Sequence, residues 1–412
     1  MSLPWFYPDK VSAEPDETVA IHASSLASPC TLIVSRVGRT IEEVARFDAI
    51  SIREHPTPTD ADTNGCGWPE VFSFRIEADW RPGYYDLALT DPDGQTSHHF
   101  ICIRRKSGSK KCDAVIILAT NTYAAYNYWG GSNAYADVKS LMAGEVTADE
   151  SRDGAIGRLS RLRPYPQLQI APPADVPRLI NYNRRAPGEM PFPGDPAWSK
   201  AHHPSPYDGS AGFLHKWEHR FAAWAETNGY EIDYLTDHDF VGQDQDLLSG
   251  YKAVLVVGHS EYWSGDQRFT LEKFVHDGGN LAIFSGNTCY WKVRWEDAGD
   301  TLVAHKWRGE LDDPLWADPE TRPHATHLWS HEAFGQPEAQ LTGLSFVYGG
   351  YHRICMCVAR GSAGFTVYRD LHWALEGTDL YYGDVIGSDV PLIGYENDGC
   401  PIRFGPDGLP VA

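Results

Sequence analysis

Apolar and polar positions alternate along the first hundred residues with the period of two that half-buried β-strands require. The segments 19–23, 72–76 and 85–89 all show this alternation. The last of them leads to Asp93-Gly94, a dipeptide typical of hairpin turns. Short strands broken by turn residues, without helical periodicity, predict an immunoglobulin-like β-sandwich over residues 1–104.

The pattern changes beyond residue 111, where continuous apolar runs alternate with segments of helical period. Such an order of strands and helices predicts a mostly parallel α/β sheet domain, amidotransferase-like, over residues 112–412. The expected strands are 114–118, 251–257 and 281–284, and the expected helices are 214–224 and 269–275.

Two further segments have a composition of their own. Residues 105–111 are rich in Lys, Arg, Gly and Ser, so we expect a linker there. Residues 163–209 hold eleven of the 28 prolines and little periodicity. A long Pro-rich segment in a compact domain is typical of a lid or binding loop, and disorder is the alternative reading.

Length and charge narrow the classes of partner. A chain of 412 residues exceeds one ordinary core, which agrees with two domains. The formal net charge of −21 repels nucleic-acid phosphates and anionic lipid, so we expect neither nucleic acid nor membrane as a partner. A small neutral molecule meets no such electrostatic barrier.

The N-terminus and the cysteines bear on the compartment. The first ten residues lack a basic stretch followed by an apolar core, so we expect no secretory signal and a cytoplasmic protein. The eight cysteines are scattered and form no CxxC pair that would indicate a zinc knuckle or a redox site. Most are expected to be reduced and buried.

Polar clusters follow the three expected strands of the second domain. They occupy residues 120–135, 258–264 and 285–291, and a fourth cluster lies at 394–398. The carboxyl ends of parallel strands meet at one edge of a sheet, which is where such sheets bind ligands. We therefore expect these clusters to converge.

The residue types in these clusters suit a hard cation. Tyr, Glu and His offer oxygen and nitrogen ligands without sulfur, and a phenolate oxygen favours ferric iron. The alternative is that each tyrosine only packs, with its hydroxyl bound to water. The pair His259 and Glu261 is harder to explain by packing, because a carboxylate entering a partly buried cleft needs a partner.

The same clusters resemble the motifs of the large, catalytic subunit of N,N-dimethylformamidase and its relatives. The matching segments occur in the same order across nearly the whole second domain. They are Ala125-Tyr126-Asn127, Gly130-Gly131-Ser132-Asn133-Ala134-Tyr135, Gly258-His259-Ser260-Glu261-Tyr262, Asn287 ahead of Tyr290-Trp291, and Gly394-Tyr395-Glu396.

The resemblance implies one Fe(III) ion per chain, held by Tyr126, Tyr135 and Glu261, with Tyr128 as the alternative to Tyr135. It places His259, Asn287 and Glu396 around that ion. The expected activity is hydrolysis of the C–N bond of a small neutral amide. Glu396 would be the general base, and His259 and Asn287 would orient water and stabilise the oxyanion.

The residues also permit two other functions, and the resemblance permits two kinds of assembly. Cys289 follows an expected strand, so a thiol amidohydrolase that uses Cys289 with His259 is the enzymatic alternative. The 14 Trp and 21 Tyr residues also permit a non-enzymatic carbohydrate-binding protein. The resemblance leaves open a homo-oligomer and a small partner subunit.

Overall fold

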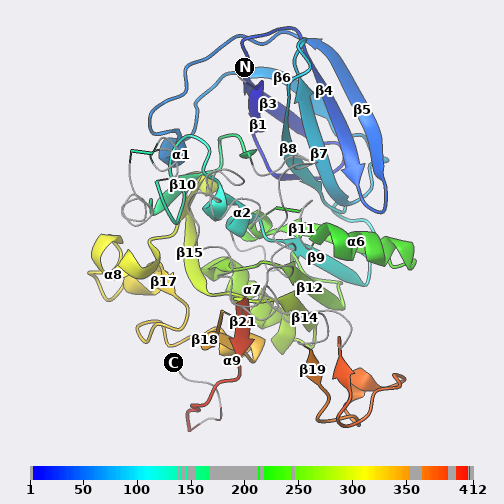
Figure 1. The fold of residues 1–412 in the computed structure, drawn as a ribbon, viewed down its shortest axis with the longest axis vertical. Coiled ribbons are helices and arrows are strands. Elements are labelled where there is room, and N and C mark those ends of the chain that lie inside the picture. The colour runs from blue at the N-terminus through cyan, green and yellow to red at the C-terminus, as the bar shows by residue number, and fades with distance from the viewer. Residues whose placement is uncertain are drawn as a thin grey trace, which may run out of the picture.

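The fold is known from a computed structural model, which places most of the chain (Figure 1). The residues that the structure describes are 3–137, 140, 144–145, 155–166, 212–213, 218–242, 246–351, 364–387, 396–406 and 408. Most of the Pro-rich segment predicted as a lid, from residue 167 on, lies outside these ranges, and so do residues 214–217 of the first expected helix.

Two sheets make up the N-terminal part. Apolar side chains on alternate positions of both sheets meet in one buried core, as Ile21, Val34 and Phe74 show. This arrangement agrees with the predicted β-sandwich (Figure 1, top). The first sheet has the order β1(Trp5–Pro8), β3(Thr18–Ser24), β6(Glu70–Arg75), and the second has the order β2(Ser12–Ala13), β8(Thr96–Ile103), β7(Gly83–Thr90), β4(Cys30–Val37), β5(Ile41–Ile50).

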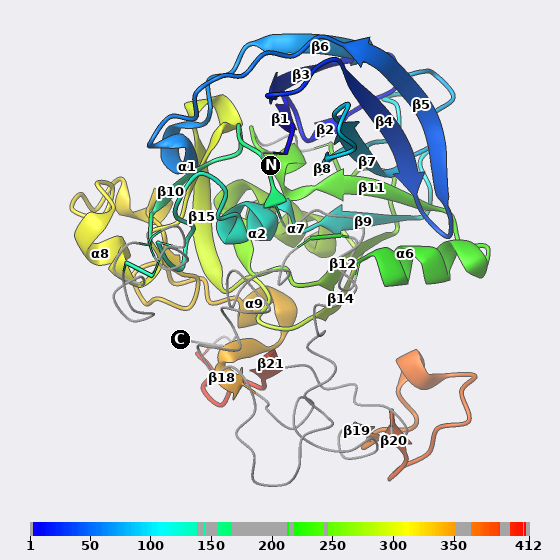
Figure 2. The ribbon, with the colours of Figure 1, turned by 45° about the horizontal axis from the view of Figure 1, so that its top comes forward.

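A four-stranded parallel sheet lies below the two N-terminal sheets in both views (Figures 1 and 2). Its strand order is β11(Ile232–Thr236), β9(Ala114–Leu118), β12(Ala253–Gly258), β14(Asn280–Ser285). All three of its pairings are parallel. The expected strand 114–118 is therefore confirmed residue for residue, and the other two expected strands are confirmed within two residues at each end.

Few long helices accompany this sheet in the described part of the chain. They are α2(Thr120–Tyr126), α6(Glu218–Thr227) and α7(Gly265–His276). The hydroxyl of Ser264 caps α7 by accepting a hydrogen bond from the backbone amide of Gln267. The short helices are α1(Ala61–Asn64), α8(Gly309–Asp312) and α9(Ala339–Thr342), and the 3₁₀ turns are Asp237–Phe240, Asp297–Gly299, Lys306–Arg308, Arg322–His324 and Trp373–Leu375.

Antiparallel and mixed pairings also occur in this part of the chain, so the prediction of a mostly parallel domain holds only for the four-stranded sheet. The pairing of sequence-distant segments produces these sheets, and local periodicity does not report it. They are a mixed sheet of β10(Arg158–Ser160), β16(Thr301–Val303), β15(Trp291–Glu296), β13(Tyr262–Ser264) and β17(His327–Leu328), and the pairs β18(Ser345–Tyr351) with β21(Glu396–Gly399) and β19(Phe365–Thr366) with β20(Val385–Ile386).

The N-terminal sheets and the parallel sheet share a buried interface. One apolar cluster contains Tyr84 and Phe100 of the N-terminal sheets and Tyr123 of α2, the helix that follows β9. Arg36 of β4 forms an ion pair with Glu226 of α6 at 2.5 Å. The predicted linker 105–111 is also tied down, because Arg105 donates to the buried Asp233 carboxylate at 2.8 Å. These contacts fix the two parts against each other.

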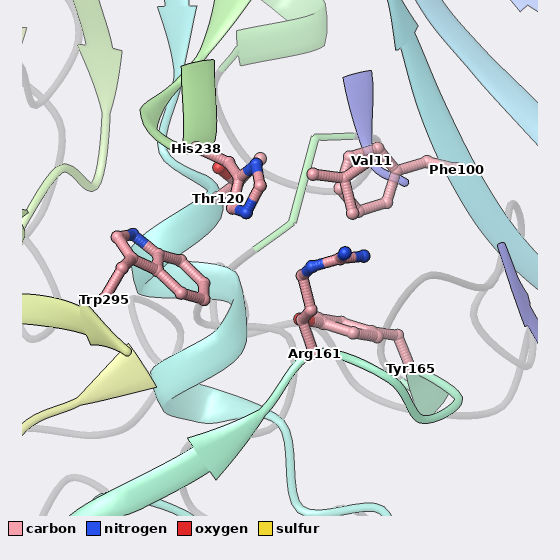
Figure 3. A pocket seen from close by; sticks show the side chains of 7 residues that line it. All are labelled: Val11, Phe100, Thr120, Arg161, Tyr165, His238 and Trp295. Carbon is pink, nitrogen blue, oxygen red and sulfur yellow. The ribbon is translucent and has the colours of Figure 1, made fainter. Parts of the chain in front are cut away.

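A small pocket lies at this interface (Figure 3). Val11 and Phe100 line it from the N-terminal part, and Thr120, His238 and Trp295 line it from the second part. None of the predicted catalytic or metal-binding residues belongs to its lining, so we do not assign the chemistry to it.

Two further sequence expectations can be compared with the described residues. The six cysteines among them are all free, in agreement with the expectation of reduced thiols. No helix in the described ranges combines the length and the apolar character needed to cross a membrane.

Candidate active site

The carboxylate of Glu261 lies at the centre of the predicted site, three residues after β12 ends. One of its oxygens, Oε2, accepts a hydrogen bond from Tyr135 at 2.8 Å and one from Tyr126 at 3.2 Å. His259 Nε2 lies 3.3 Å from the same oxygen. Glu261 is only 3% exposed, so these contacts replace water around a buried charge.

The other oxygen of Glu261 fixes the orientation of the carboxylate. Trp291 Nε1 donates to Oε1 at 2.8 Å, and Asn287 Nδ2 donates to it at 3.2 Å. The Glu261 backbone is held as well, because its amide donates to the hydroxyl of Thr122 at 3.1 Å. The side chain therefore presents Oε2, and not Oε1, to the two tyrosines.

The two tyrosines are held as a pair by a buried asparagine. Tyr126 is the last residue of α2, and its ring centroid lies 4.6 Å from that of Tyr135. Asn133 donates from Nδ2 to the carbonyl of Tyr126 at 3.3 Å, and its Oδ1 accepts from the amide of Tyr135 at 2.9 Å. This bridge sets the spacing of the two hydroxyls.

The N-terminal part supports the loop that carries Tyr135. Asp62 of α1 accepts a hydrogen bond from the amide of Ser132 at 2.8 Å. Gly131 suits this position, because its φ is +150° and a Cβ on it would lie 2.7 Å from the same carboxylate. The fully buried Arg163 donates to the carbonyls of Asn127 at 3.1 Å and Trp129 at 2.6 Å.

Glu396 reaches the site from β21, near the end of the chain. Its Oε2 lies 3.6 Å from His259 Nδ1, so the imidazole stands between two carboxylates. Asp398 holds β21 in place, because its carboxylate accepts the amides of Asn287 at 2.9 Å and Thr288 at 3.2 Å. Gly286 allows this approach, since a Cβ there would lie 2.3 Å from the carbonyl oxygen of Glu396.

Burial and charge shift the pKa values of these groups in different directions. Burial, and then the charge of Glu261, raise the pKa of Tyr126 and of Tyr135 well above 10. Burial also raises the pKa of Glu396 to about 7, although His259 opposes the shift. Burial disfavours the charged form of His259, but the Glu261 and Glu396 carboxylates outweigh it and raise its pKa.

The donor set fits a cation. Two buried phenols converge on one carboxylate oxygen, and their raised pKa values keep them neutral unless a positive charge replaces their protons. Three oxygen donors without sulfur form a hard site. Tyr126, Tyr135 and Glu261 would hold such an ion.

Two side chains next to this set were not identified from the sequence. Tyr262, fully buried, donates from its hydroxyl to that of Tyr135 at 2.6 Å. Lys306 places its Nζ 3.2 Å from the centroid of the Tyr135 ring, and burial lowers the pKa of its ammonium to about 7. The motif around Glu261 contains Tyr262, but Lys306 carries no sequence signal because it follows a strand of a different sheet.

The structure thus brings together all six residues predicted for the site: Tyr126, Tyr135 and Glu261 as ligands, and His259, Asn287 and Glu396 around them. Asn287 donates from Nδ2 to Glu261, and its predicted role in orienting water and stabilising the oxyanion stays a prediction. Gly394 and Tyr395 of the fourth cluster lie outside the described residues.

Cys289 has an environment unlike that of a nucleophile. Its side chain is completely buried in the core beside Trp263 and Trp329. Burial raises the pKa of its thiol to about 12, against the opposing charge of Arg268. A reactive cysteine needs an accessible thiol with a lowered pKa, so the geometry gives the thiol alternative no support.

Comparison with known proteins finds two similar enzyme subunits. The beta subunit of N,N-dimethylformamidase from an Alcaligenes species is 37% identical over 101 residues, and that from Paracoccus aminophilus is 36% identical over 101 residues. Each alignment covers 24% of this chain and only 13% of the relative. The comparison therefore samples a small part of those longer proteins.

A solved structure aligns with part of the chain. The cycloisomaltooligosaccharide glucanotransferase of a Paenibacillus species aligns with 31% of this chain and 18% of its own, at 13% identity and a TM-score of 0.19. A likeness of that size carries no argument about the fold or the function.

A sequence family gives the most extensive match. The family described as N,N-dimethylformamidase beta subunit-like, C-terminal, matches residues 34–412. The matched region contains every residue of the site built above, from Tyr126 to Glu396. The chain belongs to the N,N-dimethylformamidase beta subunit-like, C-terminal family.

Proposed function

We propose that this protein is an iron-dependent amidohydrolase that cleaves the C–N bond of a small neutral amide. The observation that carries the proposal is the convergence of Tyr126 and Tyr135 on one oxygen of Glu261. The names of the relatives, which are subunits of an enzyme acting on a small amide, support the substrate class.

In this proposal Tyr126, Tyr135 and Glu261 hold one Fe(III) ion. When bound, the ion supplies Lewis-acid polarisation of the amide carbonyl and acidifies water. Two phenolates and one carboxylate would carry three negative charges, which matches the charge of ferric iron. Trp291 and Asn287 keep the Glu261 carboxylate in the orientation that this requires.

Glu396 is placed to move the proton. With a pKa of about 7, this carboxyl can exist in either protonation state near neutral pH. In hydrolysis it would take a proton from the attacking water and deliver it to the departing nitrogen. The bond between carbonyl carbon and nitrogen then breaks, leaving a carboxylic acid and an amine.

His259 and Asn287 act beside this proton transfer. The raised pKa of His259 favours the imidazolium, whose positive charge stabilises both the adjacent carboxylates and a developing oxyanion. Asn287 is a positioning residue here, because it donates to Glu261. We assign it the orientation of that ligand.

The remaining expectations are part of the same proposal. The N-terminal sheets would form an immunoglobulin-like sandwich that supports the Tyr135 loop through Asp62. A second subunit belongs to the proposal because the relatives are themselves named as subunits. Gel filtration with mass detection of the native protein tests that assembly.

The ligand assignment predicts a coloured protein. Ferric phenolate absorbs visible light through charge transfer from ligand to metal, whereas zinc has a filled d shell. Tyr126→Phe and Tyr135→Phe should each weaken the visible band and lower the iron content measured by elemental analysis. Tyr128→Phe is the matched control and should leave both unchanged. If Tyr128→Phe removes the band and Tyr135→Phe does not, the ligand is Tyr128.

Removing the Tyr262 hydroxyl should tune the band without emptying the site. The hydrogen bond from Tyr262 lowers the energy of the lone-pair electrons on the Tyr135 oxygen, which are the electrons transferred to iron. Without it the transfer needs less energy, so Tyr262→Phe should shift the band to longer wavelength. Iron content should stay within error of the wild type. Tyr234→Phe, at a buried tyrosine of β11, should not shift the band. An unshifted band in Tyr262→Phe would contradict the proposed contact.

Glu396→Gln should reduce turnover of N,N-dimethylformamide by ~10²-fold or more and keep the iron. The base works in its ionised form, so wild-type kcat/KM should rise as the pH is raised through about 7, the pKa of Glu396. That rise should disappear in the variant. Loss of iron from Glu396→Gln would show instead that Glu396 is a ligand.

Cys289→Ala separates the proposed function from the thiol mechanism. The thiol packs in the core and accepts a hydrogen bond from Arg268 at 3.8 Å, so its removal should cost about 1 kcal/mol of unfolding free energy and leave kcat nearly unchanged. Thermal denaturation and turnover measure the two effects. Complete inactivation of a folded variant that still contains iron would establish the thiol mechanism.

A further inference from the structure

A second group of metal-ligating side chains lies outside the proposed active site. Glu310 comes from α8, His327 opens β17, and His331 follows four residues later in the chain. One ligand atom from each of the three lies within 4.8 Å of the other two. The rings of His327 and His331 are 4.5 Å apart.

His327 is already arranged as a metal ligand. His327 is only 6% exposed, and its Nδ1 has no hydrogen-bond partner in the described part of the chain. A buried polar atom without a partner is uncommon in folded proteins, and an imidazole nitrogen is a frequent metal ligand.

His331 and Glu310 already lie in contact. The Nε2 of His331 is 2.9 Å from Glu310 Oε1, and its Nδ1 accepts the amide of Ala333 at 3.2 Å. The proton is therefore on Nε2. An ion bound to Nε2 requires the other tautomer, with the proton on Nδ1, and the contact from the Ala333 amide is then lost. Glu310 lies at the surface, where an ion can enter.

Aromatic rings lie against both histidines of the group. The Trp316 ring lies 5.6 Å from that of His327 and 5.1 Å from that of His331. Phe334 lies 6.0 Å from His331. An apolar shell of this kind lowers the local dielectric constant and strengthens the bond between a cation and its ligands.

We propose that Glu310, His327 and His331 bind one divalent transition-metal ion of the zinc class. Two imidazole nitrogens and one carboxylate form a donor set that suits zinc, whereas the proposed active site offers only oxygen. Ligands about 2.0–2.1 Å from a tetrahedral ion stand roughly 3.4 Å apart, so the three side chains must close inward. Water completes the coordination.

The bound ion would fasten α8 to β17 beside the active site. The Trp307 ring lies 6.1 Å from that of His327 and 4.9 Å from that of Trp291, which donates to Glu261. The role assigned to the ion is therefore structural. This inference does not depend on the proposed amide hydrolysis, because a different set of residues carries it.

Zinc retention by the 412-residue protein, whether or not the first site holds iron, tests the proposal. The protein is incubated with Zn²⁺ and desalted, and zinc and iron are measured together by elemental analysis. We expect about one zinc per chain in the wild type, and an affinity at least ~10²-fold weaker in His331→Ala and in Glu310→Gln. Cobalt in place of zinc should give the visible absorption bands of a tetrahedral ion.

The control is His324→Ala, at an exposed histidine of the neighbouring 3₁₀ turn, and it should retain zinc like the wild type. An unchanged iron content in each variant shows that the fold and the first site are intact. The proposal is overturned if the wild type retains no zinc, or if His331→Ala retains as much as the wild type. It is also overturned if zinc is gained only as iron is lost.

Discussion

The buried carboxylate of Glu261 is the constraint around which the second part of the molecule is arranged. An ionised carboxylate removed from water costs several kcal/mol unless its lone pairs are satisfied. Here five side chains surround it. They come from α2, from the loop after it, from the residue that follows β12, from the segment between β14 and β15 and from the start of β15: Tyr126, Tyr135, His259, Asn287 and Trp291. A change in any of those segments leaves part of that charge unpaired, so the segments are constrained jointly.

The N-terminal sheets take part in this constraint. Asp62 accepts an amide from the loop that carries Tyr135, and Tyr84 and Phe100 pack in the same core as α2. Since the loop contains Gly130 and Gly131, both with positive φ, it needs outside contacts to hold one conformation. The N-terminal part therefore helps to position Tyr135 of the proposed site as well as contributing a core of its own.

Two groups of potential metal ligands are connected by the contact between two tryptophan rings. Trp291 and Trp307 stand with ring centroids 4.9 Å apart between Glu261 and His327. The two groups differ in donor chemistry, oxygen in the first and mostly nitrogen in the second. Different ions are therefore suited to them, which lets neighbouring sites stay selective.

The sequence by itself determined the features that depend on local periodicity. The apolar run 114–118 predicts a buried strand, which is β9. The alternation at 19–23 and 72–76 predicts two half-buried strands, which are β3 and β6 of one sheet. The resemblance to a family also predicted that Tyr126, Glu261 and Glu396 belong to one site. The tertiary structure decided how they meet: Tyr126 and Glu261 are 135 positions apart, and Glu396 arrives on a strand that pairs with β18. It also decided which neighbours matter, such as Tyr262, Lys306 and Asp62, and that antiparallel sheets accompany the parallel one. Contacts between distant segments follow from packing and chain closure, which leave no periodic trace in the sequence.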